Sequence, residues 1–348
     1  MTTRRLHNYD EDKIKSLSSL EHIRKRSGMY IGRIGNGSEY DDGIYVLLKE
    51  VVDNAVDEYI MGYGDHILIT LEGSGVTVRD YGRGIPLGRV VECVSRINTG
   101  AKYSDEVFQF SVGLNGIGAK AVNALSRNFE VRSHRGGEFA GAVFRQGKLV
   151  DERRGKMPDA PDGTFVAFEP DPEIFGDVVF DCEHVNRRLQ LYSFLNAGLR
   201  IEYNGRIFIS RNGLRDLLRE EAGDEMIYPV LHYQSKTLEF AVSHTQRFEE
   251  TFLSFVNGQY TPDGGAHLSA FREGLVKGFN EFSKSRFDGD DIREGMAGAI
   301  AVRLKEPIFE SQTKTKLGNT ELRGELVAKV RETLVDLLHR NPKAAEAA

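Results

Sequence analysis

The chain has 348 residues, of which 40% are hydrophobic and 28% charged, with a net charge of −6. This length allows about two domains with their own cores, and the acidic balance argues against a surface devoted to nucleic acid or anionic membrane. Cys93 and Cys182 are too few for a disulfide framework or a zinc site. Because the sequence has neither an apolar run of about 18 residues nor a signal-peptide core, we expect a cytoplasmic protein without a membrane partner.

The first informative stretch is 44–61, IYVLLKEVVDNAVDEYIM, which follows a polar N-terminal segment, a short helix ending near Gly28 and a glycine-rich loop. Apolar residues recur at three- and four-residue spacing, which predicts a helix with one buried stripe. Glu50, Asp53, Asn54 and Asp57 are predicted to line the opposite face. Such a face suits a hard cation and a water that needs a base, although charged stretches more often form a solvated helix face.

Two alternating strands, HILITLEG and VTVRD, lead into DYGRGIPLGR at 80–89. Glycines there would let the backbone approach a ligand, and Asp80 could accept a hydrogen bond from an amino group. A tight turn explains the same glycines equally well.

The second informative stretch is NTGAKYSDEVFQFSVGLNGIGAKAVNALS, in which Gly113, Gly116 and Gly118 precede a helical segment. Exposed amides at a helix start can bind phosphate oxygens, and Lys102 adds a cation. The spacing G-x-x-G-x-G disfavours a Rossmann fingerprint, and the sequence contains no P-loop motif.

Residues 129–210 read as β-rich, with a helix near EHVNRRLQLYSFL and a hairpin that turns at Asn204-Gly205. Thr164 begins one strand, where it could reach a pocket or serve only as a β-branched residue. EEAGDEM marks a predicted boundary between domains 1–223 and 224–348. In the second domain we expect a long helix from Asn319 to about Arg340, capped by Asn319 and stopped by Pro342.

Several stretches occur in an order that is characteristic of one family: SGMYIG, KEVVDNAVDE, DYGRGIP, GAKY, GLNGIGAKAVNALS, DGGAH and ESQTKTKLGN. Together they resemble the N-terminal ATPase region of bacterial type IIA topoisomerase B subunits, those of DNA gyrase and topoisomerase IV. The resemblance implies an α+β chain, with a GHKL-type ATPase sandwich of sheet and helices followed by a smaller α/β transducer domain. It also implies ATP and Mg²⁺ as cofactors.

The resemblance assigns roles to residues on both sides of the expected site. Glu50 corresponds to the general base, Asn54 to the Mg²⁺ ligand, and Lys314 to a catalytic lysine that, with Gln312, reaches the γ-phosphate. The adenine pocket corresponds to Asp80, Arg83, Gly84, Pro86 and Thr164. The lid over the triphosphate corresponds to Lys102, Gly113, Leu114, Asn115, Gly116, Ile117 and Gly118. Without the resemblance, Lys314 and Lys316 would be read as solvated loop lysines.

The resemblance further implies that an N-terminal arm containing Tyr9 reaches over a partner, so that ATP binding closes a homodimer around a DNA duplex. DNA contact would involve Arg272, Lys277, Lys284 and Arg286. The chain is expected to be part of a longer subunit that joins a topoisomerase A subunit through regions outside this sequence, and it would not cleave DNA itself.

Departures from the family pattern affect the expected affinity for nucleotide more than the mechanism. Asn115 stands where the family usually has histidine, Val112 where it has glycine, and Phe108 where it commonly has tyrosine. Two alternatives therefore stay open: a nucleotide-dependent dimerisation module with little turnover, and another GHKL ATPase such as a mismatch-repair type. The sequence does not distinguish gyrase from topoisomerase IV.

Overall fold

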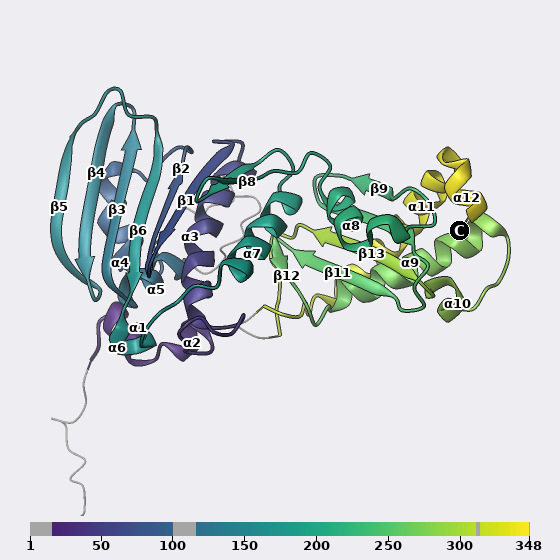
Figure 1. The fold of residues 1–348 in the computed structure, drawn as a ribbon, viewed down its shortest axis with the longest axis horizontal. Coiled ribbons are helices and arrows are strands. Elements are labelled where there is room, and N and C mark those ends of the chain that lie inside the picture. The colour runs from purple at the N-terminus through teal and green to yellow at the C-terminus, as the bar shows by residue number, and fades with distance from the viewer. Residues whose placement is uncertain (1–15, 100–115, 311–313, 348) are drawn as a thin grey trace, which may run out of the picture.

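The computed structural model describes residues 16–99, 116–310 and 314–347. Two β-sheets follow one another along the long axis of the chain, the first in its N-terminal part and the second in its C-terminal part (Figure 1). Each sheet has helices packed on it and its own hydrophobic core. Across the described ranges, no helix is both long and apolar enough to cross a bilayer.

The first sheet has eight strands in the spatial order β5-β4-β3-β6-β2-β1-β7-β8. Neighbouring strands are antiparallel except for β1 and β7, which are parallel. The strands are β1 (His66–Glu72), β2 (Gly75–Asp80), β3 (Ser126–Arg135), β4 (Glu138–Arg145), β5 (Lys148–Lys156), β6 (Gly163–Pro170), β7 (Arg200–Tyr203) and β8 (Arg206–Phe208). The predicted mixture of helices and sheet is confirmed, and β7 and β8 turn at Asn204-Gly205 as expected, with positive φ at both residues.

Helices α3, α4 and α5 pack together against this sheet and enclose the first core, whose fully buried members include Leu47, Val52 and Val56. The apolar stripe of α3 is buried because its three- and four-residue spacing places these side chains on one side. The helices of this part are α1 (Ser19–Lys25), α2 (Gly28–Ile31), α3 (Gly43–Ile60), α4 (Val90–Ser95), α5 (Gly118–Ala124), α6 (Pro172–Phe175) and α7 (Cys182–Leu195).

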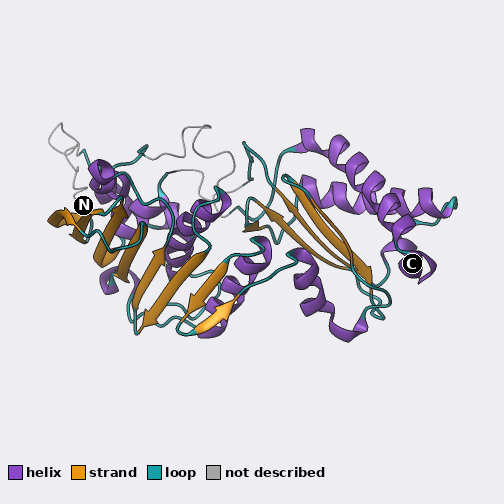
Figure 2. Cartoon of the chain, turned by 90° about the horizontal axis from the view of Figure 1, so that it is seen from above, coloured by secondary structure: helices purple, strands orange, loops and turns teal. Residues whose placement is uncertain are grey.

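The second sheet has five strands in the order β12-β11-β13-β10-β9 and carries helices on both faces (Figure 2). Its strands are β9 (Leu231–Gln234), β10 (Leu238–His244), β11 (Thr251–Val256), β12 (Gln259–Tyr260) and β13 (Met296–Val302). Its helices are α8 (Leu214–Ala222), α9 (Ala266–Ser283), α10 (Gly289–Arg293), α11 (Arg323–Arg340) and α12 (Pro342–Ala347). Because both faces are covered, every residue of β10 is buried, including the polar Glu239, Ser243 and His244.

Helix α8 lies at the junction between the two parts of the chain. Its leucines Leu214, Leu217 and Leu218 are buried in a cluster with β10 and β13 of the second sheet. The same cluster contains Phe194 and Leu195 from the end of α7. A domain boundary after residue 223 would separate α8 from the sheet it covers, so we propose that the second domain begins before α8.

For the last long helix the predicted cap is wrong, whereas the predicted end is confirmed, since α11 ends at Arg340. Asn319 makes no capping hydrogen bond to a helix; instead its side chain accepts from the Ile308 N–H and donates to the Glu306 carbonyl. Pro342 does follow the end of α11, but it begins the short helix α12, because proline at a first helical position loses no intrahelical hydrogen bond. Asn319 therefore stabilises the base of the loop that precedes the helix.

Candidate active site

A cleft of about 500 Å³ lies between α3, the middle strands β2, β3 and β6 of the first sheet, and the start of α5. Every predicted site residue within the described ranges lines it: Glu50, Asn54, Asp80, Arg83, Gly84, Pro86, Gly116, Ile117, Gly118, Thr164 and Lys314. The other predicted site residues, Tyr9, Lys102, Gly113, Leu114, Asn115 and Gln312, lie outside the described residues. Residues distant in sequence thus converge on one cavity.

Helix α3 presents Glu50, Asn54 and Glu58 to the cleft at four-residue spacing. The prediction that Asp53 and Asp57 share this face is wrong, since both are fully buried and neither lines the cleft. Residues three apart on an ideal helix lie about 60° from one another. Asp53 and Asp57 therefore lie to one side of Glu50 and Asn54, where the elements packed against α3 bury them. Glu58, which the sequence analysis missed, could have been found from the same four-residue step.

The Glu50 carboxylate lies directly against the start of α5. A Cβ atom at Gly118 would lie 1.8 Å from Glu50 Oε2, so any larger residue there would displace the carboxylate. The Asn54 side chain, one turn further on, donates from Nδ2 to the Glu50 carbonyl at 2.8 Å. With the amide nitrogen bound to the helix backbone, the carboxamide oxygen is the atom suited to coordinate a hard cation.

Asp80 lies almost wholly buried at the opposite end of the cleft. Its Oδ1 accepts from the backbone N–H of Gly82 at 2.9 Å and of Thr164 at 3.1 Å. Burial raises the pKa of Asp80 to about 6, with Glu58 adding to the rise, while these two hydrogen bonds and Arg79 oppose it. At neutral pH the carboxylate is therefore mostly ionised and can accept through Oδ2, the oxygen that neither backbone group uses.

The turn after Asp80 depends on close backbone contacts. Gly84 has φ of +73°, and a Cβ there would lie 2.6 Å from the His134 carbonyl oxygen, so only glycine fits without strain. Arg83 forms two hydrogen bonds with the Glu58 carboxylate, at 3.0 and 2.9 Å, and stacks over the Tyr63 ring. The Glu58–Arg83 pair thereby holds the turn against α3.

Between the polar ends, the cleft is lined by apolar side chains from α3, the first sheet and the loop after β2. These are Val51, Ala55, Val78, Ile85, Val131 and Val166. An apolar slot with one carboxylate at its end is the arrangement that binds a flat heterocycle and reads its exocyclic amino group. A phosphate chain would extend towards Glu50 and Gly118.

Two cations approach the Glu50 end of the cleft. Lys120, which the sequence analysis treated only as part of a helix, is almost fully buried and donates from Nζ to the Thr99 carbonyl at 2.7 Å. Lys314 reaches the cleft from the second domain, with φ of +57°. Its ammonium lies close enough to α3 to contribute to the lowered pKa of Asp53. The cleft therefore contains groups from both domains.

We predict that nucleotide affinity falls as the pH is lowered through about 6, because protonated Asp80 no longer accepts a hydrogen bond through Oδ2. Binding of a non-hydrolysable ATP analogue, measured by calorimetry, should be roughly tenfold weaker at pH 5 than at pH 7. Asp80→Asn is the control, since its amide does not titrate while the phosphates of the analogue titrate equally in both experiments. Parallel pH profiles for the two proteins would contradict the prediction.

Comparison with known proteins finds a family match for each of the two parts of the chain. Residues 39–171 match the family described as histidine kinase-, DNA gyrase B- and HSP90-like ATPase, and residues 213–348 match the family described as DNA gyrase B. The B subunit of DNA topoisomerase 4 from Borreliella burgdorferi is 56% identical over 96% of this chain. The B subunit of DNA gyrase from Clostridium acetobutylicum is 36% identical, also over 96%.

The chain spans 56% and 57% of the length of these two relatives, respectively. Among solved structures, the 43K ATPase domain of Thermus thermophilus gyrase B, determined in complex with an aminocoumarin, is 31% identical with a TM-score of 0.78. That match covers 95% of this chain and 93% of the other.

Proposed function

This chain belongs to the family of DNA gyrase and topoisomerase IV B subunits and corresponds to their ATPase region, and from this membership we propose that it binds and hydrolyses ATP as the clamp of a type II topoisomerase. The observation that carries the proposal is the convergence of Glu50, Asn54, Asp80 and Lys314 on one cleft. These residues supply a base, a metal ligand, an adenine acceptor and a cation.

In this proposal, adenine occupies the apolar slot and donates its amino hydrogen to Asp80 Oδ2. The phosphates extend past the backbone of Gly116, Ile117 and Gly118 towards the second domain. Glu50 orients a water for attack on the γ-phosphate and accepts its proton. Lys314 lies where it can neutralise charge that develops on the transferred phosphoryl group.

The residues of the cleft fit a magnesium ion held mainly by nucleotide. No cluster of three or more metal-binding His, Cys, Asp or Glu side chains occurs in the described ranges. Mg²⁺ commonly keeps several waters and takes one or two protein ligands together with substrate phosphates, which suits the single carboxamide oxygen of Asn54. Bound there, it would offset the negative charge of the phosphates.

The finer parts of the proposal concern the partners. By analogy with the family, ATP binding joins two copies into a homodimer around a DNA duplex, in the cytoplasm and together with a topoisomerase A subunit. Two of the residues predicted to contact DNA already form ion pairs on α9, Arg272 with Glu250 at 2.9 Å and Lys277 with Glu273 at 2.7 Å. These pairings offset the positive charge available to phosphates, which leaves Lys284 and Arg286 as the better candidates.

The proposal is tested by measuring phosphate release from ATP in the presence of Mg²⁺ and the mass of the chain by sedimentation. We expect release that depends on Mg²⁺, and a shift from monomer to dimer when a non-hydrolysable ATP analogue is added. A chain that dimerises with the analogue but releases no phosphate would favour the nucleotide-dependent dimerisation module. A chain that binds no nucleotide would refute both.

A further inference from the structure

Asp53 is a buried carboxylate that receives hydrogen bonds from three separate elements. Lys49, on the same helix, donates from Nζ to Oδ2 at 2.6 Å. Tyr192 of α7 donates its hydroxyl to Oδ1. Gln259 of β12, in the second domain, donates from Nε2 to Oδ2 at 3.3 Å. Asp53 thus joins the helix that carries Glu50 and Asn54 to the second domain.

Backbone hydrogen bonds join the turn that follows Gln259 to the segment that carries Lys314. The turn after β12 forms an irregular pairing with residues 315–317: Asp263 N donates to the Thr315 carbonyl at 3.1 Å, and Leu317 N donates to the Gly264 carbonyl at 3.0 Å. Leu317 is buried in the core of the second domain. A displacement of β12 would therefore be transmitted to the backbone next to Lys314.

The charges around Asp53 support the same connection. The Lys49 ammonium lies 2.6 Å from Asp53 Oδ2, and the Tyr192 hydroxyl is bound to Oδ1. Asp53 is therefore the acceptor of an ion pair with Lys49, and hydrogen bonds that involve a charged group are about twice as strong as neutral ones.

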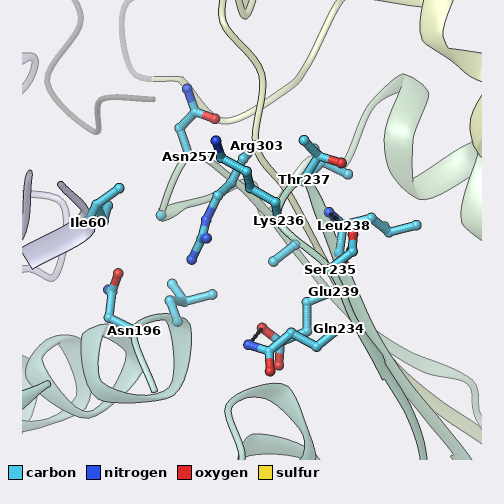
Figure 3. A pocket seen from close by; sticks show the side chains of 14 residues that line it. Ile60, Asn196, Gln234, Ser235, Lys236, Thr237, Leu238, Glu239, Asn257 and Arg303 are labelled. Atoms are coloured by element: carbon cyan, nitrogen blue, oxygen red, sulfur yellow. Dashed lines mark hydrogen bonds between the residues drawn. The ribbon is translucent and has the colours of Figure 1, made fainter. Parts of the chain in front are cut away.

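The junction between the domains also includes the apolar cluster of α8 with Phe194 and Leu195, and next to it the junction contains a small space. Beyond the C-terminal end of α3, a pocket of about 30 Å³ is surrounded by Ile60 and Asn196 on one side and by Gln234, Lys236 and Arg303 on the other (Figure 3). That volume accommodates one or two water molecules. Water can exchange between alternative polar partners there, so this region would resist domain movement less than the buried contact at Asp53.

We propose that Asp53 is a positioning residue that, by accepting from Gln259, sets the separation between Lys314 and Glu50 across the cleft. The proposal rests on the proposed function, since these two groups are assigned there to the same phosphoryl transfer. Asp53 does not line the cleft and would act on the reaction only through the position of the second domain.

The test uses Gln259→Met, which preserves the length of the side chain and removes its donor. We expect kcat for ATP hydrolysis to fall about tenfold, because a small misplacement of a catalytic group reduces the rate strongly, while affinity for a non-hydrolysable ATP analogue changes less than twofold. In a Lys314→Ala background the same substitution should have little further effect, because it acts through Lys314. Gln246→Met, at an exposed glutamine of the same domain, is the matched control.

A second measurement does not depend on hydrolysis. Spin labels at Cys182, which is exposed, and at an introduced Phe248→Cys would report the distance between the domains in a Cys93→Ser background. The distance distribution should be broader in Gln259→Met than in the parent.

The possible outcomes separate the two proposals. An unchanged distribution, an unchanged kcat, or losses that multiply with Lys314→Ala would overturn the positioning role. A broadened distribution in a chain whose parent releases no phosphate would retain the domain contact and refute the proposed function.

Discussion

Replacing Glu50 with glutamine is expected to slow ATP hydrolysis by about a thousandfold, since a positioned general base contributes roughly 10² to 10⁴ in rate. The amide retains the size of the carboxylate, which lies against Gly118, but it cannot accept the proton from the attacking water. Nucleotide binding should persist because adenine recognition depends on the other end of the cleft. Steady-state phosphate release and binding of a non-hydrolysable analogue measure the two effects separately.

Glu58→Gln is the matched control for this experiment. Glu58 lies two turns from Glu50 on the same helix and lines the same cleft, but its carboxylate is bound by Arg83. We expect its loss to weaken the turn after Asp80, and so to affect nucleotide affinity more than kcat. Equal trace activity in wild type and Glu50→Gln would show that the chain has no turnover that depends on Glu50, and would favour the dimerisation module.

Replacing Lys314 with alanine is expected to lower kcat about a hundredfold or more, because preorganised charge at the reacting group is commonly worth that much. The change should appear mainly in kcat rather than in analogue binding, since the charge to be neutralised develops as the phosphoryl group is transferred. Lys314 reaches the cleft from the second domain. The variant therefore tests whether that domain takes part in the chemistry.

Lys316→Ala provides a control from the same loop. Lys316 is partly exposed and pairs with Glu310 at 3.0 Å, and surface pairs of this kind contribute about 0 to 1 kcal/mol to stability. We expect nearly unchanged kinetic constants for this variant. If both lysine variants lost activity to the same extent, the effect would belong to the loop as a whole and the specific role of Lys314 would be refuted.

Much of the fold could be predicted from the sequence because its signals are local. The apolar periodicity of 44–61 predicts α3, and the Asn204-Gly205 pair predicts the turn between β7 and β8. Glycines that precede a helix predicted the start of α5. The role of Asn319 was missed because its hydrogen-bond partners, Ile308 and Glu306, are distant from the helix it precedes.

The sequence by itself determined the secondary structure, the family and the chemical types that form the site, because spacing along a helix and the order of motifs are properties of the chain alone. Only the tertiary structure decided which polar residues of α3 face the cleft: Glu50, Asn54 and Glu58 line it, whereas Asp53 is buried and bound by Tyr192 and Gln259. Helical periodicity sets the angle between side chains but not what packs against each face. That choice depends on contacts with elements far away in the sequence.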